Sequence, residues 1–259
     1  MPFESDDYLS RHFKTSGAEL SKKIDELVAL VVPTSSQNLP LYREMLVTVM
    51  RMAQADRSRW DAKILLQTMR EMEHAFSRLD QFKRRRKVTV FGSARTPVEH
   101  PLYALARELG ETLARYELMV ITGAGGGIMA AAHEGAGMDN SLGLNITLPF
   151  EAAANEFIAG DPKLIDFNYF FTRKLSFVKE SDAAAGFPGG FGTMDEVFES
   201  LTLIQTQKMA PIPVILFDRA FWERILDFDA LLDEGEVRFL RLIANQAAIA
   251  IEQVRLHQE

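Results

Sequence analysis

The 259-residue sequence contains no cysteine. This absence excludes disulfide bonds, thiolate metal sites and a cysteine nucleophile, and it fits a reducing compartment. No uncharged apolar run reaches membrane-spanning length. The first residues show neither a basic start nor an apolar core, so no signal peptide is expected and the cytoplasm is the expected location. The formal net charge of -7 argues against a general binder of nucleic acid or membrane surfaces, which would present a broad basic face.

Two familiar nucleotide-binding signatures are also missing. The turns at residues 92–95 and 122–127 do not follow G-x-G-x-x-G spacing, and no lysine follows a glycine run in Walker A spacing. A dinucleotide cofactor or an NTPase activity is therefore not supported. The five histidines show no metal-ligand spacing, and no Ser-His-Asp set is indicated. We expect neither a cofactor nor a metal.

What is present begins with a helical pattern over residues 1–86. Apolar residues recur three and four apart in three segments, at 24–31, 41–52 and 60–82, while residues 33–40 read as a loop. A basic run at 83–87 ends this region. Such a run is compatible with a nucleic-acid or phosphate contact, but we interpret it as a solvated junction. The sequence thus predicts an N-terminal helical extension over residues 1–86.

From residue 88 short β-rich runs alternate with amphipathic segments. Strands are expected at 88–91, 118–121, 142–148, 168–171, 183–187 and 212–217, and helices at 101–115, 128–136, 172–180, 194–208 and 221–232. This alternation predicts an α/β fold of the Rossmann-like kind, a doubly wound parallel sheet with helices on both faces. We assign it to residues 87–235, followed by a C-terminal packing helix at 236–259.

Three of the expected strands end in small or glycine-rich turns. We name them loop 1 (residues 92–95), loop 2 (residues 122–127) and loop 3 (residues 188–193). In open parallel sheets, ligands bind beyond the carboxyl ends of the strands, where these loops would meet. Three such turns at equivalent positions favour a site for a nucleotide-sized phosphate or sugar ligand.

Loop 3 leads directly into a helix. Glycines let backbone N–H groups approach an anion without an intervening Cβ, and the helix start adds unpaired N–H groups and a positive dipole end. Thr193 would lend a hydroxyl, and Glu196 would lie about one turn into the helix. Two plainer interpretations remain open at this point: Thr193-x-x-Glu196 is also a capping box, and glycines between a strand and a helix are ordinary turn chemistry.

The segment Pro-Gly-Gly-Phe-Gly-Thr-Met-Asp-Glu at residues 188–196 resembles the PGGxGTxxE signature of the LOG ("Lonely Guy") family. Its members are cytokinin-activating phosphoribohydrolases, long misnamed lysine decarboxylases. The Arg173-Lys174 pair resembles the family's second motif, and residues 90–94 and 122–129 resemble its first two phosphate-side loops. The resemblance runs from about 88 to 218. The N-terminal extension and residues 143–149 resemble a longer bacterial branch.

This resemblance implies a function as well as a fold. It implies a homodimer or higher oligomer that uses no metal and hydrolyses the N-glycosidic bond of a nucleoside 5'-monophosphate, such as cytokinin riboside monophosphate or AMP, to free base and ribose 5-phosphate. By carry-over Arg173 and Glu196 are the catalytic pair. The expected substrate-binding residues are Ser93, Gly123, Gly126, Lys174, Gly189, Gly190, Gly192 and Thr193. Neither nucleic acid nor a membrane is expected as a partner.

The proposed chemistry matches these residue types. Cleavage of a ribosyl C–N bond develops oxocarbenium character, which a carboxylate such as Glu196 stabilises. Arg173 is read as an electrostatic group, because a guanidinium does not give up its proton near neutral pH. The alternatives are a broad nucleoside-monophosphate nucleosidase and a non-catalytic nucleotide-binding module. His133 is expected to pack rather than bind, and Asn145 to satisfy a backbone group.

Two features depart from the family pattern. Loop 2 has Ala124 where many relatives carry glycine, which affects how closely a ligand approaches there. Residues 239–259 resemble the closing helix of GAF sensor domains, but no GAF sheet precedes them. We therefore interpret this segment as a packing or self-association helix.

Overall fold

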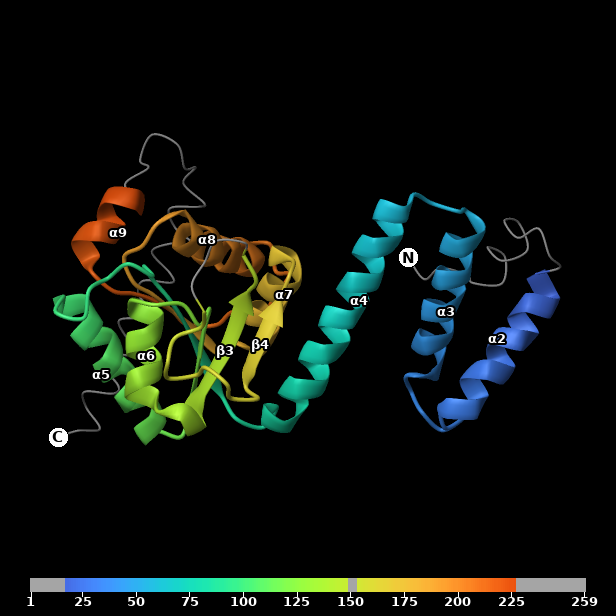
Figure 1. The fold of residues 1–259 in the computed structure, drawn as a ribbon, viewed down its shortest axis with the longest axis horizontal. Helices are drawn as coiled ribbons and strands as arrows, with labels where there is room; N and C mark the ends of the chain where they lie inside the picture. Colours follow the sequence, from blue (N-terminus) through green and yellow to red (C-terminus); the bar gives the residue numbers. More distant parts are fainter. Residues whose placement is uncertain (1–16, 149–152, 227–259) are drawn as a thin grey trace. The chain divides into compact units, whose positions relative to one another are not determined.

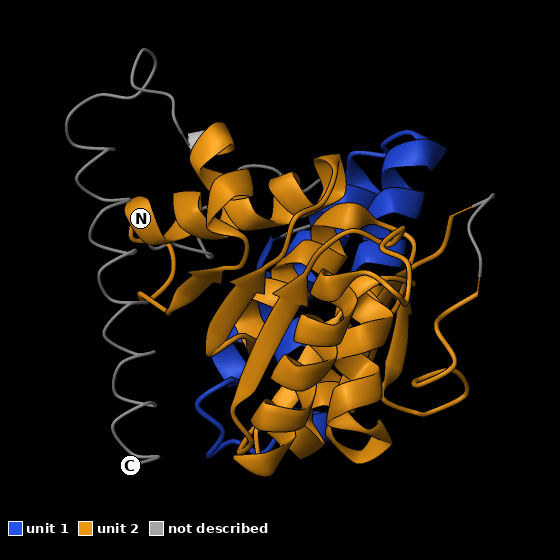
Figure 2. Ribbon diagram, turned by 90° about the vertical axis from the view of Figure 1, so that its left-hand side faces the viewer, with its two compact units in different colours: residues 1–69 blue, residues 70–259 orange. Residues whose placement is uncertain are grey.

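The computed structural model describes residues 17–148 and 153–226. It divides into two compact units, residues 1–69 and residues 70–259 (Figure 2). The domain limits predicted from the sequence stay predictions, and the C-terminal helix predicted at 236–259 lies outside the described residues. Within the described ranges, no helix is both long and apolar enough to cross a membrane.

The first unit is helical over its described residues. It contains α2 (Gly17–Val31), α3 (Leu39–Gln54) and the first half of α4 (Arg59–Leu79). A small apolar core joins α2 to α3 through Ile24, Val28 and Val47. The expected loop at 33–40 is shorter than predicted, because α3 begins at Leu39 with proline in its first turn, where a missing N–H costs nothing.

The second unit is built on a six-stranded sheet (Figure 1). The strands are β1 (Lys87–Phe91), β2 (Met119–Thr122), β3 (Ser141–Ile146), β4 (Leu164–Phe167), β5 (Ala183–Gly186) and β6 (Val214–Leu216). Their order is β4-β3-β2-β1-β5-β6, and every neighbouring pair is parallel. The predicted α/β, Rossmann-like doubly wound sheet is confirmed. From β1 the strands β2, β3 and β4 are added on one side, and β5 and β6 are added on the other side of β1. Ligands of such folds bind at this change in strand order, here between β1 and β5.

Helices cover both faces of this sheet. The helices are α5 (Pro101–Arg115), α6 (Ile128–Ala136), α7 (Phe170–Glu180), α8 (Phe191–Gln205) and α9 (Arg219–Leu226), with single turns at Asp80–Phe82 and Met138–Asn140. Val88 and Val90 of β1 belong to the core shared with α5 and α6, whereas Phe91 belongs to the core shared with α7, α8 and α9. Successive side chains of β1 point to opposite faces of the sheet, and all of them are buried because each face carries helices.

The fourth strand is the main correction to the sequence prediction. It was expected at 168–171 but lies at Leu164–Phe167, and residues from Phe170 onward belong to α7. The physical reason is a distant partner: Glu71 of α4 accepts hydrogen bonds from the backbone N–H groups of Asn168 and Tyr169. Those N–H groups are therefore used to cap a helix. Likewise α8 starts at Phe191, three residues before the predicted position 194.

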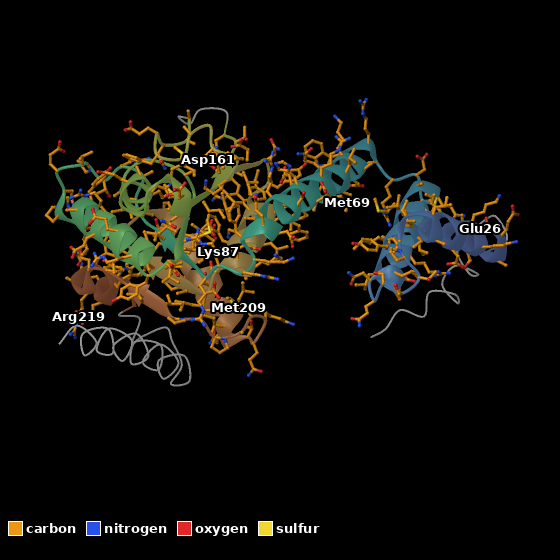
Figure 3. All side chains as sticks on the ribbon, turned by 90° about the horizontal axis from the view of Figure 1, so that it is seen from below. Glu26, Met69, Lys87, Asp161, Met209 and Arg219 are labelled. Atoms are coloured by element: carbon orange, nitrogen blue, oxygen red, sulfur yellow. The ribbon has the colours of Figure 1, made fainter. Side chains whose placement is uncertain are left out.

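The basic run at 83–87 is not uniformly solvated, which corrects its interpretation as a solvated junction. Lys87, labelled in Figure 3, lies in β1 with its side chain 4% exposed, and its Nζ lies 3.1 Å from Oε2 of buried Glu180. Arg85 donates to Asn140 at 2.6 Å and is partly buried. Only the remaining members of the run face solvent. Part of this run is therefore structural, since a buried lysine needs a paired carboxylate.

Candidate functional site

Loops 1, 2 and 3 meet at one edge of the sheet because β2, β1 and β5 are adjacent. The N–H of Ser93 in loop 1 donates to the carbonyl of Pro188 in loop 3 at 3.1 Å. The carbonyl of Ser93 accepts from the N–H of Ile128, the first residue of α6, at 3.0 Å. Loop 1 thus connects loop 2 to loop 3. The sequence prediction that the three turns gather at the carboxyl ends of their strands agrees with these contacts.

Loop 3 leaves open space in front of α8. The helix begins at Phe191 with Gly190 as its N-cap and no side-chain cap, so the first N–H groups have no partner within the helix. A Cβ placed on Gly190 or Gly192 would meet no atom within 4 Å. Gly190 has φ -90°, which other residues adopt. These two glycines therefore provide access to the helix start and are not required by the backbone conformation.

The two plainer interpretations of loop 3 fare differently. Thr193 lies inside the first turn of α8 and is not its N-cap, so the capping box predicted as an alternative is not formed. Gly189 does serve turn packing: a Cβ there would lie 2.1 Å from Oγ1 of Thr193. The structure thus separates Gly189, which makes room for the threonine hydroxyl, from Gly190 and Gly192, which face open space.

Arg173 and Glu196 lie together beside these loops. Nη2 of Arg173 on α7 lies 3.1 Å from Oε1 of Glu196 on α8, and the side chains are only 12% and 8% exposed. Nη1 of Arg173 also lies 3.9 Å from the position of a Cβ on Gly123, which joins the pair to loop 2. Two residues 23 positions apart are thus held as an ion pair at the edge where the glycine loops meet.

The surroundings of the Arg173 guanidinium hold it in place without saturating it. The rings of Phe170 and Phe177 have their centroids 5.2 Å and 5.6 Å from its Cζ, within the range of cation–π attraction. Its Nε is buried and has no hydrogen-bond partner in the described part of the chain. An arginine donates five hydrogen bonds, so this one retains capacity for an anionic or carbonyl ligand.

The Glu196 carboxyl has a shifted pKa. Burial raises it above the ordinary value of 4.5, and the charges of Arg173 and then Lys174 oppose the shift without cancelling it. Burial disfavours the ionised form of a carboxyl group, so it moves the pKa toward neutrality. A carboxylate of this kind is a better proton acceptor at neutral pH than a solvated one.

Lys174 makes contacts of a different kind from its neighbour Arg173. Its Nζ lies 2.7 Å from Oδ1 of Asp195 and 3.2 Å from Oε2 of Glu199, both on α8. Burial lowers its pKa, but the bonds to the two carboxylates outweigh burial and raise it overall. Lys174 therefore cross-links α7 to α8. Its predicted role as a substrate ligand stays a prediction.

Loop 2 differs from loop 3, because its glycines face protein. Gly127 has φ +58°, and a Cβ there would lie 2.3 Å from the carbonyl oxygen of Ser93. A Cβ on Gly126 would lie 3.1 Å from the carbonyl oxygen of Ala94. Ala124 itself has φ 60° and is fully buried. Ser93 caps its own turn, its Oγ accepting from the N–H of Arg95 at 3.1 Å. The ligand roles of Ser93, Gly123 and Gly126 remain predictions.

Asn155, which the sequence did not predict as part of the site, holds loop 2 through hydrogen bonds to its backbone. The N–H of Asn155 donates to the carbonyl of Ala124 at 2.8 Å, and its Nδ2 donates to the carbonyl of Gly125 at 3.0 Å. Asn155 also contacts Nδ1 of His133 at 3.3 Å. No local pattern marks Asn155, which lies 30 positions from the glycine it binds.

His133 is buried in the core, in agreement with the packing prediction. Its ring contacts the hydroxyl of Thr122 and the carbonyl of Leu142 at 3.2 and 3.3 Å, and it is fully enclosed. Burial lowers the pKa of His133 to about 4, against partial opposition from its hydrogen bonds. Asn145 does not bind a backbone group as expected, because its Nδ2 donates to Oδ1 of Asp166 at 2.8 Å.

Over residues 17–148 and 153–226, no group of three or more histidine, aspartate or glutamate side chains is arranged to hold a metal ion. The polar groups at the site are the Arg173–Glu196 pair, the hydroxyl of Thr193 and the backbone N–H groups that start α8.

A family model and several solved structures are similar to parts of this chain. A family model described as "Possible lysine decarboxylase" matches residues 126–254. None of the curated proteins compared with the chain matches it. The X-ray structure of TM1055, a structural-genomics target, is similar with 26% identity and a TM-score of 0.44, over 65% of this chain and 99% of that one. A molybdenum cofactor carrier protein from Chlamydomonas reinhardtii is similar with 19% identity and a TM-score of 0.38, over 62% and 99% of the two chains.

Proposed function

Since the family-model match over residues 126–254 supports a place in the LOG-type superfamily, we propose that this chain hydrolyses the N-glycosidic bond of a nucleoside 5'-monophosphate. The proposed products are a free base and ribose 5-phosphate, and the proposed substrates are AMP and cytokinin riboside monophosphate. The observation that carries the proposal is the 3.1 Å pair of Arg173 and Glu196, buried beside the open start of α8.

The substrate phosphate is assigned to the start of α8. Its unpaired N–H groups and positive dipole end suit an anion, and Gly190 and Gly192 present no Cβ to keep it away. Thr193 adds a hydroxyl in the same turn. Glu196 lies one helical turn further along, so a ribose attached to the phosphate would extend toward its carboxylate.

The reaction then uses the ion pair in two roles. Glu196 stabilises the positive charge that develops on the ribose and accepts a proton from water, whose oxygen bonds to C1' as the C1'–N bond breaks. The bonding electrons leave with the base, which takes up a proton from solvent. Arg173 stabilises the negative charge on the departing base electrostatically. The raised pKa of Glu196 is the direction that proton acceptance near neutrality requires.

Release of free base tests the proposal. Purified protein is incubated with AMP, the other common nucleoside monophosphates and isopentenyladenosine monophosphate, and free base and ribose 5-phosphate are quantified by chromatography. The proposal expects equal amounts of the two products from at least one substrate. Comparable rates across the panel would identify a broad nucleosidase, whereas a strong preference for the isopentenyl substrate would identify a cytokinin-activating enzyme.

A non-catalytic nucleotide-binding module is the alternative outcome of the same experiment. It predicts that nucleoside monophosphates raise the melting temperature while no base is released from any of them. Light scattering on the same sample tests the accompanying proposal of a homodimer or higher oligomer, which predicts at least twice the 29.2 kDa chain mass.

A further inference from the structure

We infer that Glu71 is a positioning residue for Arg173, through the helix that carries it; the inference rests on the proposed function. Glu71 belongs to α4, outside the glycine loops and outside the region of resemblance to the LOG family. It lies nearly a hundred positions from the residues it contacts. No sequence motif marks it.

The Glu71 carboxylate receives hydrogen bonds on both oxygens. Oε1 accepts from the backbone N–H and from Nδ2 of Asn168 at 3.0 and 2.9 Å. Oε2 accepts from Oγ1 of Thr172 at 2.6 Å and from the N–H of Tyr169 at 3.4 Å. Glu71 is 5% exposed and Thr172 is 1% exposed, so these bonds form away from solvent. Hydrogen bonds to a carboxylate are stronger than those between neutral groups.

These contacts place a carboxylate at the N-terminus of α7. The helix begins at Phe170, and its N-cap Tyr169 makes no side-chain cap hydrogen bond. A helix start without a local cap needs partners from elsewhere, and a carboxylate there also complements the helix dipole. Glu71 therefore supplies from a distant helix the cap that the local sequence of α7 does not contain.

The capped turn is the one from which Arg173 projects. Arg173 follows Thr172 directly, and its N–H bonds to the carbonyl of Tyr169 at 3.3 Å. A rotation or slide of α7 would change the 3.1 Å separation between Arg173 and Glu196. Displacements of about 1 Å at a reacting centre lower rates on the order of a hundredfold. Glu71 thus sets the reach of Arg173 without touching the substrate.

The site discriminates a carboxylate from an amide. Glutamine has the size of glutamate but offers one acceptor oxygen and one NH₂ donor. In Glu71→Gln the NH₂ group would face either the two donors of Asn168 or the backbone N–H of Tyr169. The Thr172 hydroxyl also lies 2.8 Å from the carbonyl of Tyr169, so it can donate there and accept from the NH₂ group. At least one backbone N–H of the cap therefore loses its acceptor while the packing volume is preserved. The matched control is Glu73→Gln on the same helix, because Glu73 is exposed.

The first test separates kcat from KM. In the nucleoside-monophosphate assay we expect Glu71→Gln to lower kcat at least tenfold and to change KM less than threefold, whereas Glu73→Gln changes neither. Thr172→Val should show the same loss of kcat, whereas Thr172→Ser, which keeps the hydroxyl, should keep the wild-type kcat. These two variants carry the test if Glu71→Gln does not fold. A kcat within twofold of wild type in folded Glu71→Gln or Thr172→Val overturns the inference.

The second test asks whether Glu71 acts through Arg173. If it does, Glu71→Gln lowers the residual activity of Arg173→Ala less than twofold; an equal loss in both backgrounds overturns the inference. AMP, which carries both the phosphate and the base, provides a readout that does not need turnover. If the wild type releases no base, the proposed function fails, but the inference still predicts that Glu71→Gln and Arg173→Ala reduce the melting-temperature rise with AMP non-additively. A wild type that shows neither turnover nor stabilisation overturns both proposals.

Discussion

Loops 2 and 3 look alike in sequence, but Gly127 of loop 2 and the glycines Gly190 and Gly192 of loop 3 have opposite surroundings. In loop 2, the surrounding backbone requires a glycine at position 127: its φ is positive, and a Cβ would clash with the backbone of loop 1. In loop 3, Gly190 and Gly192 have open space where a side chain would stand. Glycine count alone therefore does not identify a ligand cradle. What distinguishes the two loops is whether the missing Cβ would meet protein or solvent.

The largest effect is expected at the closed loop. Gly127→Ala should lower the free energy of unfolding by more than about 4 kcal/mol, because it combines a left-handed backbone with a Cβ 2.3 Å from a carbonyl oxygen. Gly137→Ala is the matched control, since Gly137 has φ +71° and nothing within 4 Å of its Cβ position. We expect it to cost about 1–3 kcal/mol, for the backbone conformation alone. Denaturant unfolding measures both, and equal losses would contradict the distinction.

Activity should depend on the carboxylate at the open loop. Glu196→Gln is expected to reduce kcat by roughly a hundred- to a thousandfold, the range for removing one charge-stabilising group. Stabilisation by ribose 5-phosphate should survive, because the N–H groups of α8 remain. Since the pKa of Glu196 is raised, the wild-type rate should fall with decreasing pH at a value above 4.5. Glu108→Gln on α5, where Glu108 is exposed, serves as the control, and a kcat of Glu196→Gln within tenfold of wild type would refute the catalytic role.

The support beneath loop 2 predicts a pH effect on stability. The pKa of His133 is about 4 in the folded chain against an ordinary 6.5, so below pH 6.5 the unfolded chain binds a proton that the folded chain does not. The His133 contribution to stability is therefore present above pH 6.5 and lost as pH falls toward 4, by up to roughly 3 kcal/mol. The free energies of unfolding of wild type and His133→Gln, measured against pH, should therefore approach each other as the pH falls from 6.5 to 4. A difference between wild type and His133→Gln that stays constant across this range would contradict the assignment.

The smallest effects are expected for Gly192→Ala, which should weaken ligand binding without lowering the stability of the fold. Gly192→Ala adds a methyl group where no atom lies within 4 Å and replaces glycine by a better helix former. We expect an unfolding free energy that is unchanged or higher by up to about 1 kcal/mol. Stabilisation by ribose 5-phosphate should weaken roughly tenfold in apparent affinity, a loss of about 1.4 kcal/mol. Unaltered ribose 5-phosphate binding would place the ligand elsewhere.

Local sequence patterns were sufficient for much of the fold. The helices at 101–115 and 128–136 have the predicted limits, because apolar periodicity and the flanking proline and glycine are local signals. The gathering of loops 1 to 3 also followed from strand alternation. The proximity of Arg173 and Glu196 agrees with the motif resemblance, although their roles stay predictions.

Long-range partners set the rest. β4 lies four residues before its predicted position because Glu71 accepts hydrogen bonds from the backbone that follows the strand. Loop 2 is held by Asn155, which lies outside the loop in the sequence. The difference between Gly127 and Gly192 depends on which atoms surround each glycine. A single sequence does not encode these neighbours as a local pattern, so neither periodicity nor motif spacing revealed them.

The packing of Thr193 against Gly189 has a consequence for the entropy of ligand capture. Thr193 is only 7% exposed, and its hydroxyl oxygen lies 2.1 Å from the position that a Cβ of Gly189 would take. The side chain is therefore already confined to one orientation before any anion arrives. Freezing a rotamer at the moment of association weakens affinity, and here that ordering is completed during folding. A larger residue at position 189 would displace the hydroxyl and return the entropic penalty to the binding step.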